Sequence, residues 1–359
     1  MGYLSTEKKL SRLFISIFTC LLFPAIALTC TIPVYQYSLA YWDSDPYEIT
    51  IFHRGQLSSK HQDIATKLQE ASWKAENLAN ITLRMVDLDN STDIIMQKLW
   101  ESQENTQLPW VIVKYPRTTG IQTEIWSGEL DSSDLNLLLD SPMRREIIRR
   151  IIKGEAGVWL LLESGNKELD DQAAQLLEQE LRRLSDLLRV SAPPGTADQI
   201  DEESLKVSFS MIRLSRENPR EKLFVEMLLN TEWDLKTFSK PIAFPVFGRG
   251  RVLYALVGEG IRQSNIESAC LFLINWCSCI IKDQNPGVDM LMSVDWDRAI
   301  NDDVYAETRL FTETYTETDL TEEKVSSNFT RNIMIAVAIQ VLVIAVIAVF
   351  VVRRRIQRD

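Results

Sequence analysis

KPIAFPVFGRGRVLYALVGEG, residues Lys240–Gly260 of this chain of 359 residues, contains two apolar runs separated by glycine. The first run is Ile242–Phe247 and the second is Val252–Val257. Gly248 and Gly250 bracket one charged residue, which is typical of a hairpin connection. Gly258 and Gly260 then mark the start of the next element. The stretch predicts two buried strands joined by a tight turn and followed by a helix.

The segments around this hairpin predict one unit of order β-α-β-α-β-β-α. A buried strand is expected at Val158–Leu162, followed by a long helix whose apolar residues recur at helical spacing. A polar, Pro-containing loop at residues 190–204 separates that helix from the rest of the unit. The remaining elements are a strand at Leu205–Met211, a helix at Pro219–Leu229, the hairpin, and a helix at Ile261–Trp276.

The preceding residues predict the same order once more. Strands are expected at Tyr47–His53 and Ile81–Leu88, with a helix at Ser59–Leu78 between them. Pro109 opens a further apolar run, Trp110–Val113, whose partner strand is Ile121–Trp126. The remaining helices are expected at residues 91–100, 135–139 and 143–152. The repeat is therefore structural, since the two halves share little residue identity.

This order, with a proline at the third strand of each repeat, resembles that of a thioredoxin-like domain. We therefore expect an α/β protein with two tandem thioredoxin-like domains, at residues 47–153 and 154–300. Leu108–Pro109 and Phe244–Pro245 are candidates for the cis peptide bond that such a domain carries at this strand. Cis bonds are nearly confined to X-Pro, which makes Pro109 and Pro245 the residues to test.

An apolar segment at Leu13–Leu28 predicts secretion. Lys8, Lys9 and Arg12 precede it, and Ala25-Ile26-Ala27 matches a small-residue cleavage site, so we expect a signal peptide at residues 1–27. The alternatives are an uncleaved anchor and a lipoprotein signal that ends at Cys30, although Ala27-Leu28-Thr29 matches the latter poorly. Residues 28–46 would form an N-terminal arm.

A second apolar segment predicts one membrane span. Residues 332–352 have Gln340 as the polar interruption, and about twenty residues at about 1.5 Å each cross a hydrocarbon core of about 30 Å. The arginines of the tail, residues 353–359, should stay in the cytoplasm, so the rest of the chain is extracytoplasmic at the inner membrane. Residues 301–331, rich in Thr and acidic residues, would form a stalk. The net charge of −11 argues against a nucleic-acid partner.

Dithiol exchange at the usual thioredoxin site is excluded by composition. That site places a thiolate at the N-terminus of the first helix, where the helix dipole lowers the pKa of the thiol. The corresponding residues, Gln56–Ser59 and Ser164–Lys167, contain no cysteine.

Four cysteines follow the signal segment: Cys30, Cys270, Cys277 and Cys279. Disulfides can form outside the cytoplasm, and four cysteines allow three pairings, which the sequence leaves open. Cys277 and Cys279 could instead form a redox pair or bind Cu(I), because two thiolates two residues apart are soft ligands. We favour structural or unpaired thiols.

Two weaker patterns are interpreted as structural. His53 ends a strand and His61 begins a helix, so they could face each other, but two surface histidines without a thiol are a poor metal site. Asp283–Asp289 offers oxygens at alternate positions, as the start of a calcium loop does. Val294 stands where such a loop needs a bidentate Glu, so we expect a capped turn.

Three segments carry a resemblance to a known family: SPMRREIIRRIIKGEAGVWLLLESG (141–165), AFPVFGRGRVLYALVGEGI (243–261) and CSCIIKDQNPGVDML (277–291). Together they resemble a membrane-anchored, thioredoxin-like-fold family of planctomycete and verrucomicrobial bacteria. The resemblance implies a bacterial origin and tandem thioredoxin-like domains, and it implies no particular reaction.

The sequence predicts a non-catalytic, membrane-tethered protein-interaction or accessory module without a cofactor. Its partners would be the membrane and a membrane or envelope protein, for example in an export or envelope-assembly system. The alternative is a thiol-redox or Cu(I)-handling protein that uses Cys277 and Cys279.

Overall fold

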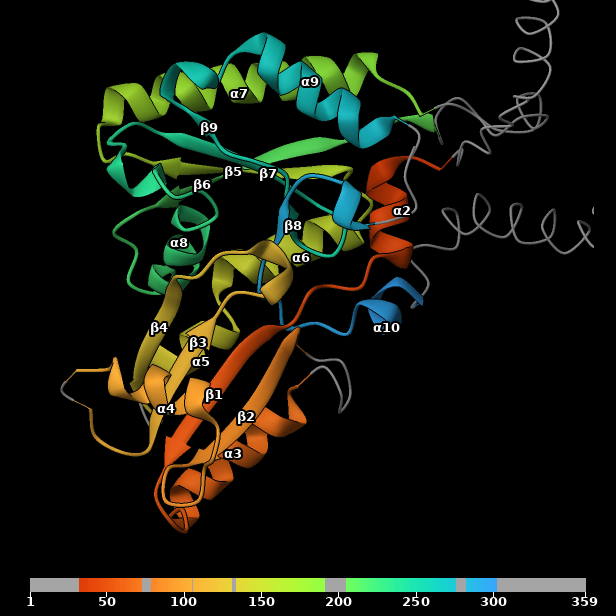
Figure 1. The fold of residues 1–359 in the computed structure, drawn as a ribbon. Coiled ribbons are helices and arrows are strands. Elements are labelled where there is room, and N and C mark those ends of the chain that lie inside the picture. The colour runs from red at the N-terminus through yellow and green to blue at the C-terminus, as the bar shows by residue number, and fades with distance from the viewer. Residues whose placement is uncertain are drawn as a thin grey trace, which may run out of the picture.

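The computed structural model describes residues 32–72, 79–104, 106–130, 134–190, 205–275 and 282–301. These residues form two β-sheets with helices packed on them, so the predicted α/β class is confirmed (Figure 1). The predicted signal peptide, stalk, membrane span and basic tail lie outside the described residues. Within the described ranges, no helix is both long and apolar enough to cross a membrane.

The first sheet has the strand order β2-β1-β3-β4. β1 (Tyr47–His53) is parallel to β2 (Ile81–Asp87) and antiparallel to β3 (Trp110–Lys114), which is antiparallel to β4 (Glu124–Glu129). The helices of this half are α3 (Ser59–Glu70), α4 (Ile94–Glu101), α5 (Asp134–Leu139) and α6 (Pro142–Ile152), with a 3-10 turn, η1, at Arg117–Thr119. We call residues 47–153 the first half.

The second sheet repeats this order and sense. β5 (Gly157–Glu163) is parallel to β6 (Phe209–Ser215) and antiparallel to β7 (Ile242–Phe247). β7 is antiparallel to β8 (Arg251–Val252) and β9 (Leu256–Val257), and β10 (Val288–Asp289) adds to β8. The helices are α7 (Lys167–Leu187), α8 (Lys222–Leu229) and α9 (Gln263–Ile274), with 3-10 turns η3 (Leu235–Thr237) and η4 (Gly258–Gly260). We call residues 154–275 the second half.

The apolar core has three buried clusters, and the smallest, made of Phe52, Val86, Met96 and Ile112, lies between the first sheet and α4. α7 and α9 cover one face of the second sheet, where Trp159, Leu161 and Phe247 are buried against them (Figure 1). α8, together with α6 of the first half, lies on the opposite face of the second sheet, which is turned toward the first sheet. There Leu160 and Phe244 belong to one continuous buried cluster with residues of the first sheet such as Ile49 and Ile51. The two halves therefore share a core.

The ends of the described chain pack beside each other. α2 (Val34–Tyr41) precedes the first sheet and lies against α9 and β7, while α10 (Trp296–Asn301) contacts α2. Arg249 joins them, because its guanidinium donates to the carbonyls of Leu39 and Ala40 and is ion-paired with Asp297. η5 (Lys282–Gln284) and β10 lead from the second half to α10.

The prediction for Pro245 is wrong. Among the described residues, Leu108–Pro109 is the one cis peptide bond, so the bond expected at Pro109 is present and that at Phe244–Pro245 is not. Pro245 lies inside β7, opposite Trp159, whereas Pro241 is the residue just before this strand. The backbone carbonyl of Pro245 accepts a hydrogen bond from the N–H of Leu253. The nitrogen of Pro245 therefore faces the gap between β8 and β9, where no strand pairs with β7, so the missing N–H of the proline costs the sheet no hydrogen bond.

Several predicted boundaries also differ from the structure; for example, the strand expected at Ile121–Trp126 is observed at Glu124–Glu129. The helix expected at Ser59–Leu78 ends at Glu70, and residues 73–78 are not described. The strand expected at Leu205–Met211 begins at Phe209 and runs to Ser215, with one isolated bridge at Lys206. The second hairpin strand is split into β8 and β9, because residues 253–255 leave the ladder.

Candidate functional site

The β1–α3 junction, expected from the sequence to lack a redox site, is closed by local hydrogen bonds. His53 Nδ1 lies 2.8 Å from the Gly55 carbonyl, and the Gly55 N–H donates to Asp87 over 3.2 Å. The Ser58 hydroxyl accepts from the backbone N–H of His61 and caps α3. His53 and His61 thus take part in a turn and in the first turn of a helix.

The β5–α7 junction is closed by one buried carboxylate. Asp170 is 3% exposed, and its Oδ1 accepts from the backbone N–H of Ser164 over 2.7 Å and from its hydroxyl over 2.8 Å. Its Oδ2 accepts from the Gly165 N–H over 3.0 Å, and the Asn166 side chain caps α7. A buried carboxylate thus binds the loop between β5 and α7, for which the sequence excludes a dithiol site.

A groove of about 330 Å³ lies beside this second junction. α7, the start of β7 and η4 form its walls, and its lining residues are Leu169, Gln172, Ala173, Leu176, Lys240, Pro241, Gly258, Glu259 and Ile261. Most of this surface is apolar. The two charged side chains, Lys240 and Glu259, form an ion pair of 2.8 Å at the rim. The pairing with Lys240 lowers the pKa of the Glu259 carboxyl.

The groove depends on a glycine. Gly258 has a φ of +50°, and a Cβ at this position would lie 2.4 Å from Cδ of Lys240. The lining residues include no cysteine, serine, threonine or histidine, and the two charged side chains among them, Lys240 and Glu259, are paired with each other, so this groove is suited to binding apolar side chains.

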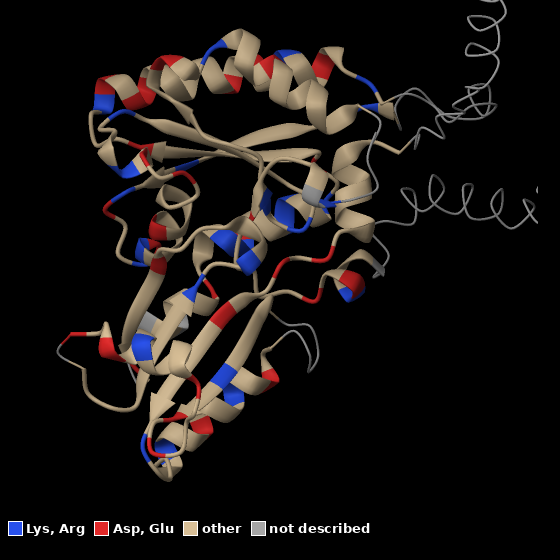
Figure 2. Ribbon diagram, viewed as in Figure 1, with Lys and Arg blue, Asp and Glu red and all other residues tan. Residues whose placement is uncertain are grey.

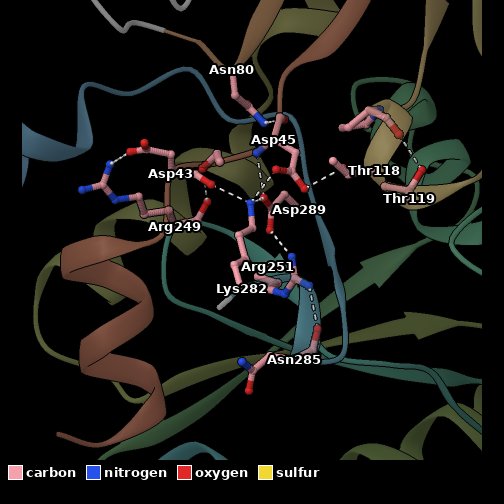
Figure 3. A network of polar contacts seen from close by, with 12 residues as sticks. Asp43, Asp45, Asn80, Thr118, Thr119, Arg249, Arg251, Lys282, Asn285 and Asp289 are labelled. Carbon is pink, nitrogen blue, oxygen red and sulfur yellow. Dashed lines mark hydrogen bonds and ion pairs between the residues drawn. The ribbon is translucent and has the colours of Figure 1, made fainter. Parts of the chain in front are cut away.

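A constellation of charged side chains lies where the two halves meet (Figure 3). The Asp289 carboxylate is ion-paired with Arg251 over 2.8 Å and with Lys282, and it accepts the backbone N–H of Asp45 over 2.8 Å. Lys282 is also paired with Asp45 over 2.8 Å, and the Thr118 hydroxyl donates to Asp45. Figure 3 shows Asp289 between Arg251 and Lys282.

The segment Asp283–Asp289, for which the sequence predicts a capped turn, contributes Asp289 to this constellation. The Asp289 carboxylate faces two cations, so it forms part of a charge-balanced junction and is not available as a calcium ligand. The tight turn before it is present, since Gly287 has a φ of +117° and a Cβ there would lie 2.5 Å from the carbonyl oxygen of Val252. In the described part of the chain, no group of three or more His, Cys, Asp or Glu residues could hold a metal ion.

One of the four cysteines that follow the signal segment, Cys270, lies within the described residues. Cys270 is a free, fully buried thiol on α9, and burial raises the pKa of this thiol. Cys30, Cys277 and Cys279 lie outside the described residues, so the expectations about their pairing and about Cu(I) stay predictions.

Sequence reasoning missed both the groove and the Asp289 junction. Each is assembled from segments far apart in the chain, and no local spacing marks them. One signal was available at Asp289, because an isolated aspartate within an apolar run usually has a buried partner.

Comparison with protein-family models finds no match, and comparison with curated proteins finds none either.

Proposed function

We propose that each half is a thioredoxin-like unit. The support is the repeated strand order, β2-β1-β3-β4 and β6-β5-β7-β8, with the same parallel and antiparallel pairings in both sheets. A helix follows the first strand of each sheet, and a proline precedes the third strand, at Pro109 and at Pro241.

We propose that the protein is a non-catalytic interaction module that binds an extended segment of a partner polypeptide. The observation that carries this function is the groove between α7, Pro241 and η4, whose lining is mostly apolar and includes no cysteine, serine, threonine or histidine. Apolar pockets with few polar groups are the usual form of a binding site. Leu169 on its wall is 39% exposed, so an apolar side chain can reach it from solvent.

We further propose that this module is extracytoplasmic and tethered by residues 332–352 to the inner membrane, as an accessory of an export or envelope-assembly system. The support is the apolar segment followed by arginines. Acidic and basic residues are interspersed over both halves (Figure 2), and the net charge is −11, which fits a protein partner better than a polyanion.

The test compares two exposed leucines of the same helix. Leu169→Glu places a charge in the groove, whereas Leu187→Glu, at a residue 64% exposed and outside the groove lining, is the matched control. Full-length protein is purified from membranes after chemical cross-linking, and companions are quantified by mass spectrometry. We expect Leu169→Glu to lose a companion that the wild type and Leu187→Glu retain. Identical companions in all three proteins would contradict the groove, and thiol-dependent insulin reduction would contradict a non-catalytic role.

A further inference from the structure

The segment from Pro286 to Ser293, which we call the clasp, lies between the two halves and binds both. On one side β10 pairs with β8, and the Met290 N–H donates to the Gly250 carbonyl over 3.0 Å. On the other side Asn80 of the first half exchanges hydrogen bonds with Met290 and Met292.

Other first-half residues hold the main chain of the clasp. The Tyr47 hydroxyl donates to the Asp289 carbonyl over 2.7 Å, and the buried Arg144 donates to the Leu291 carbonyl over 3.1 Å. Met290, Leu291 and Met292 are at most 1% exposed and belong to the core that the halves share. The apolar side chains supply contact area, but apolar contact is non-directional and tolerates more than one arrangement.

The ionic cluster, unlike the apolar contacts, depends on the relative orientation of the two halves. Asp45 belongs to the connection into the first sheet, Arg251 to the second sheet, and Lys282 and Asp289 to the segment that carries the clasp. The two carboxylates and two cations balance, and the side chains of Arg251 and Asp289 are 8% and 4% exposed. Removing charges from water costs free energy that their attraction recovers only in one good geometry, so buried pairs add little net stability.

We propose that this cluster selects one relative orientation of the two halves, and that the clasp is the device that sets it. The apolar contacts stabilise the contact between the halves. The ion pairs Asp289–Arg251 and Asp289–Lys282 form in one relative orientation of the halves, so every other orientation would leave buried charges unpaired. A molecule without the cluster keeps both halves folded but samples several angles between them.

The experiment replaces the four charged residues of the cluster by uncharged ones in the full-length chain in detergent. The variant is Asp289→Leu with Arg251→Met, Lys282→Met and Asp45→Asn, so that no charge of the cluster is left without its partner. The control removes an exposed pair, Lys240→Met with Glu259→Leu. Fluorophores are attached through a genetically encoded keto amino acid at Gln62 of α3 and Gln179 of α7, both exposed. Energy transfer then reports the distribution of distances between the halves.

We expect the quadruple variant to melt no earlier than the wild type while its distance distribution broadens, and the control to match the wild type in the width of this distribution. Asp289→Leu alone leaves Arg251 and Lys282 unpaired, so it should melt earlier. A quadruple variant with a distribution as narrow as that of the wild type would overturn the proposal. A quadruple variant that melts earlier, or does not fold, would overturn it as well, because the cluster would then be needed for stability.

Discussion

Two tryptophans of this chain have opposite surroundings. Trp159 on β5 is fully buried between the second sheet and its covering helices, whereas Trp233, in the loop after α8, is 94% exposed. We expect Trp159→Ala to lower the free energy of unfolding by about 3–5 kcal/mol, because it leaves a cavity. Trp233→Ala should change it by less than about 0.5 kcal/mol. Urea unfolding of both variants measures the contrast, and equal costs would contradict the burial of Trp159.

The buried thiol of Cys270 should be chemically silent. Burial raises the pKa of Cys270, so almost no thiolate is present at neutral pH, and the thiolate is the species that alkylating reagents attack. We expect iodoacetamide to modify Cys270 only after denaturant is added. The tryptic peptide that carries Cys270 also contains Cys277 and Cys279, so fragmentation of this peptide in the mass spectrometer is needed to assign the label to Cys270. Rapid labelling of Cys270 in the native protein would place this thiol at the surface.

At the residue scale, the sequence predicted structural roles that are set by residues close by in the chain. It indicated Pro109 because an apolar run starts right after it, but it took Pro245 for the corresponding residue when Pro241 precedes the third strand. The role of Asp289 could not be predicted, because its partners Arg251 and Asp45 come from segments 38 and 244 residues away. No periodicity encodes such a contact.

α6 carries a local ion-pair group whose contribution depends on pH. Glu146 accepts from Arg149 and Arg150, one turn further along the helix, and these bonds lower the pKa of its carboxyl from 4.5 to about 2. A carboxyl with a depressed pKa stabilises the fold above its unfolded value, and this stabilisation is lost as pH falls from about 4.5 toward 2. Glu146→Gln should therefore cost less than about 1 kcal/mol at pH 7, since the group is near the surface, and less still at pH 3. Urea unfolding at both pH values checks this, and an equal cost at both would contradict it.

At the element scale, long periodic segments were predictable and short paired ones were not. The helices at 143–152 and 167–187 show apolar residues at i, i+3 and i+4, which fix their type and buried face. β8, β9 and β10 are two residues long, too short for any alternation, and they exist because β7 and Gly287 hold them in place. η4, which forms one wall of the groove, comes directly after β9, so the groove was as hard to predict as these short strands.

The proposed tether gives a prediction for the whole molecule. A chain that ends before Asn332 keeps the signal segment and all described residues but loses the apolar segment and the arginines. We expect it to be found soluble outside the cytoplasm, whereas the full chain stays in the membrane fraction after carbonate extraction. Cell fractionation with immunodetection measures both, and a truncated protein that stays in the cytoplasm would contradict the proposed topology.

The shared core predicts that the two halves unfold together. Ile51 of β1 and Leu160 of β5 belong to the same buried cluster, so a cavity on one side removes contacts that stabilise the other. Ile51→Ala should cost about 2–5 kcal/mol and should lower the hydrogen-exchange protection of β5 amides as much as that of β1 amides. Leu181→Ala, in the outer layer between α7 and the second sheet, is the control from the other side, and it should lower β1 protection too. Independent halves would respond differently: β5 would keep its protection in Ile51→Ala, and denaturant would give two transitions. One transition in both variants is the expected result, because neither half can keep its inner sheet face covered once the other is lost.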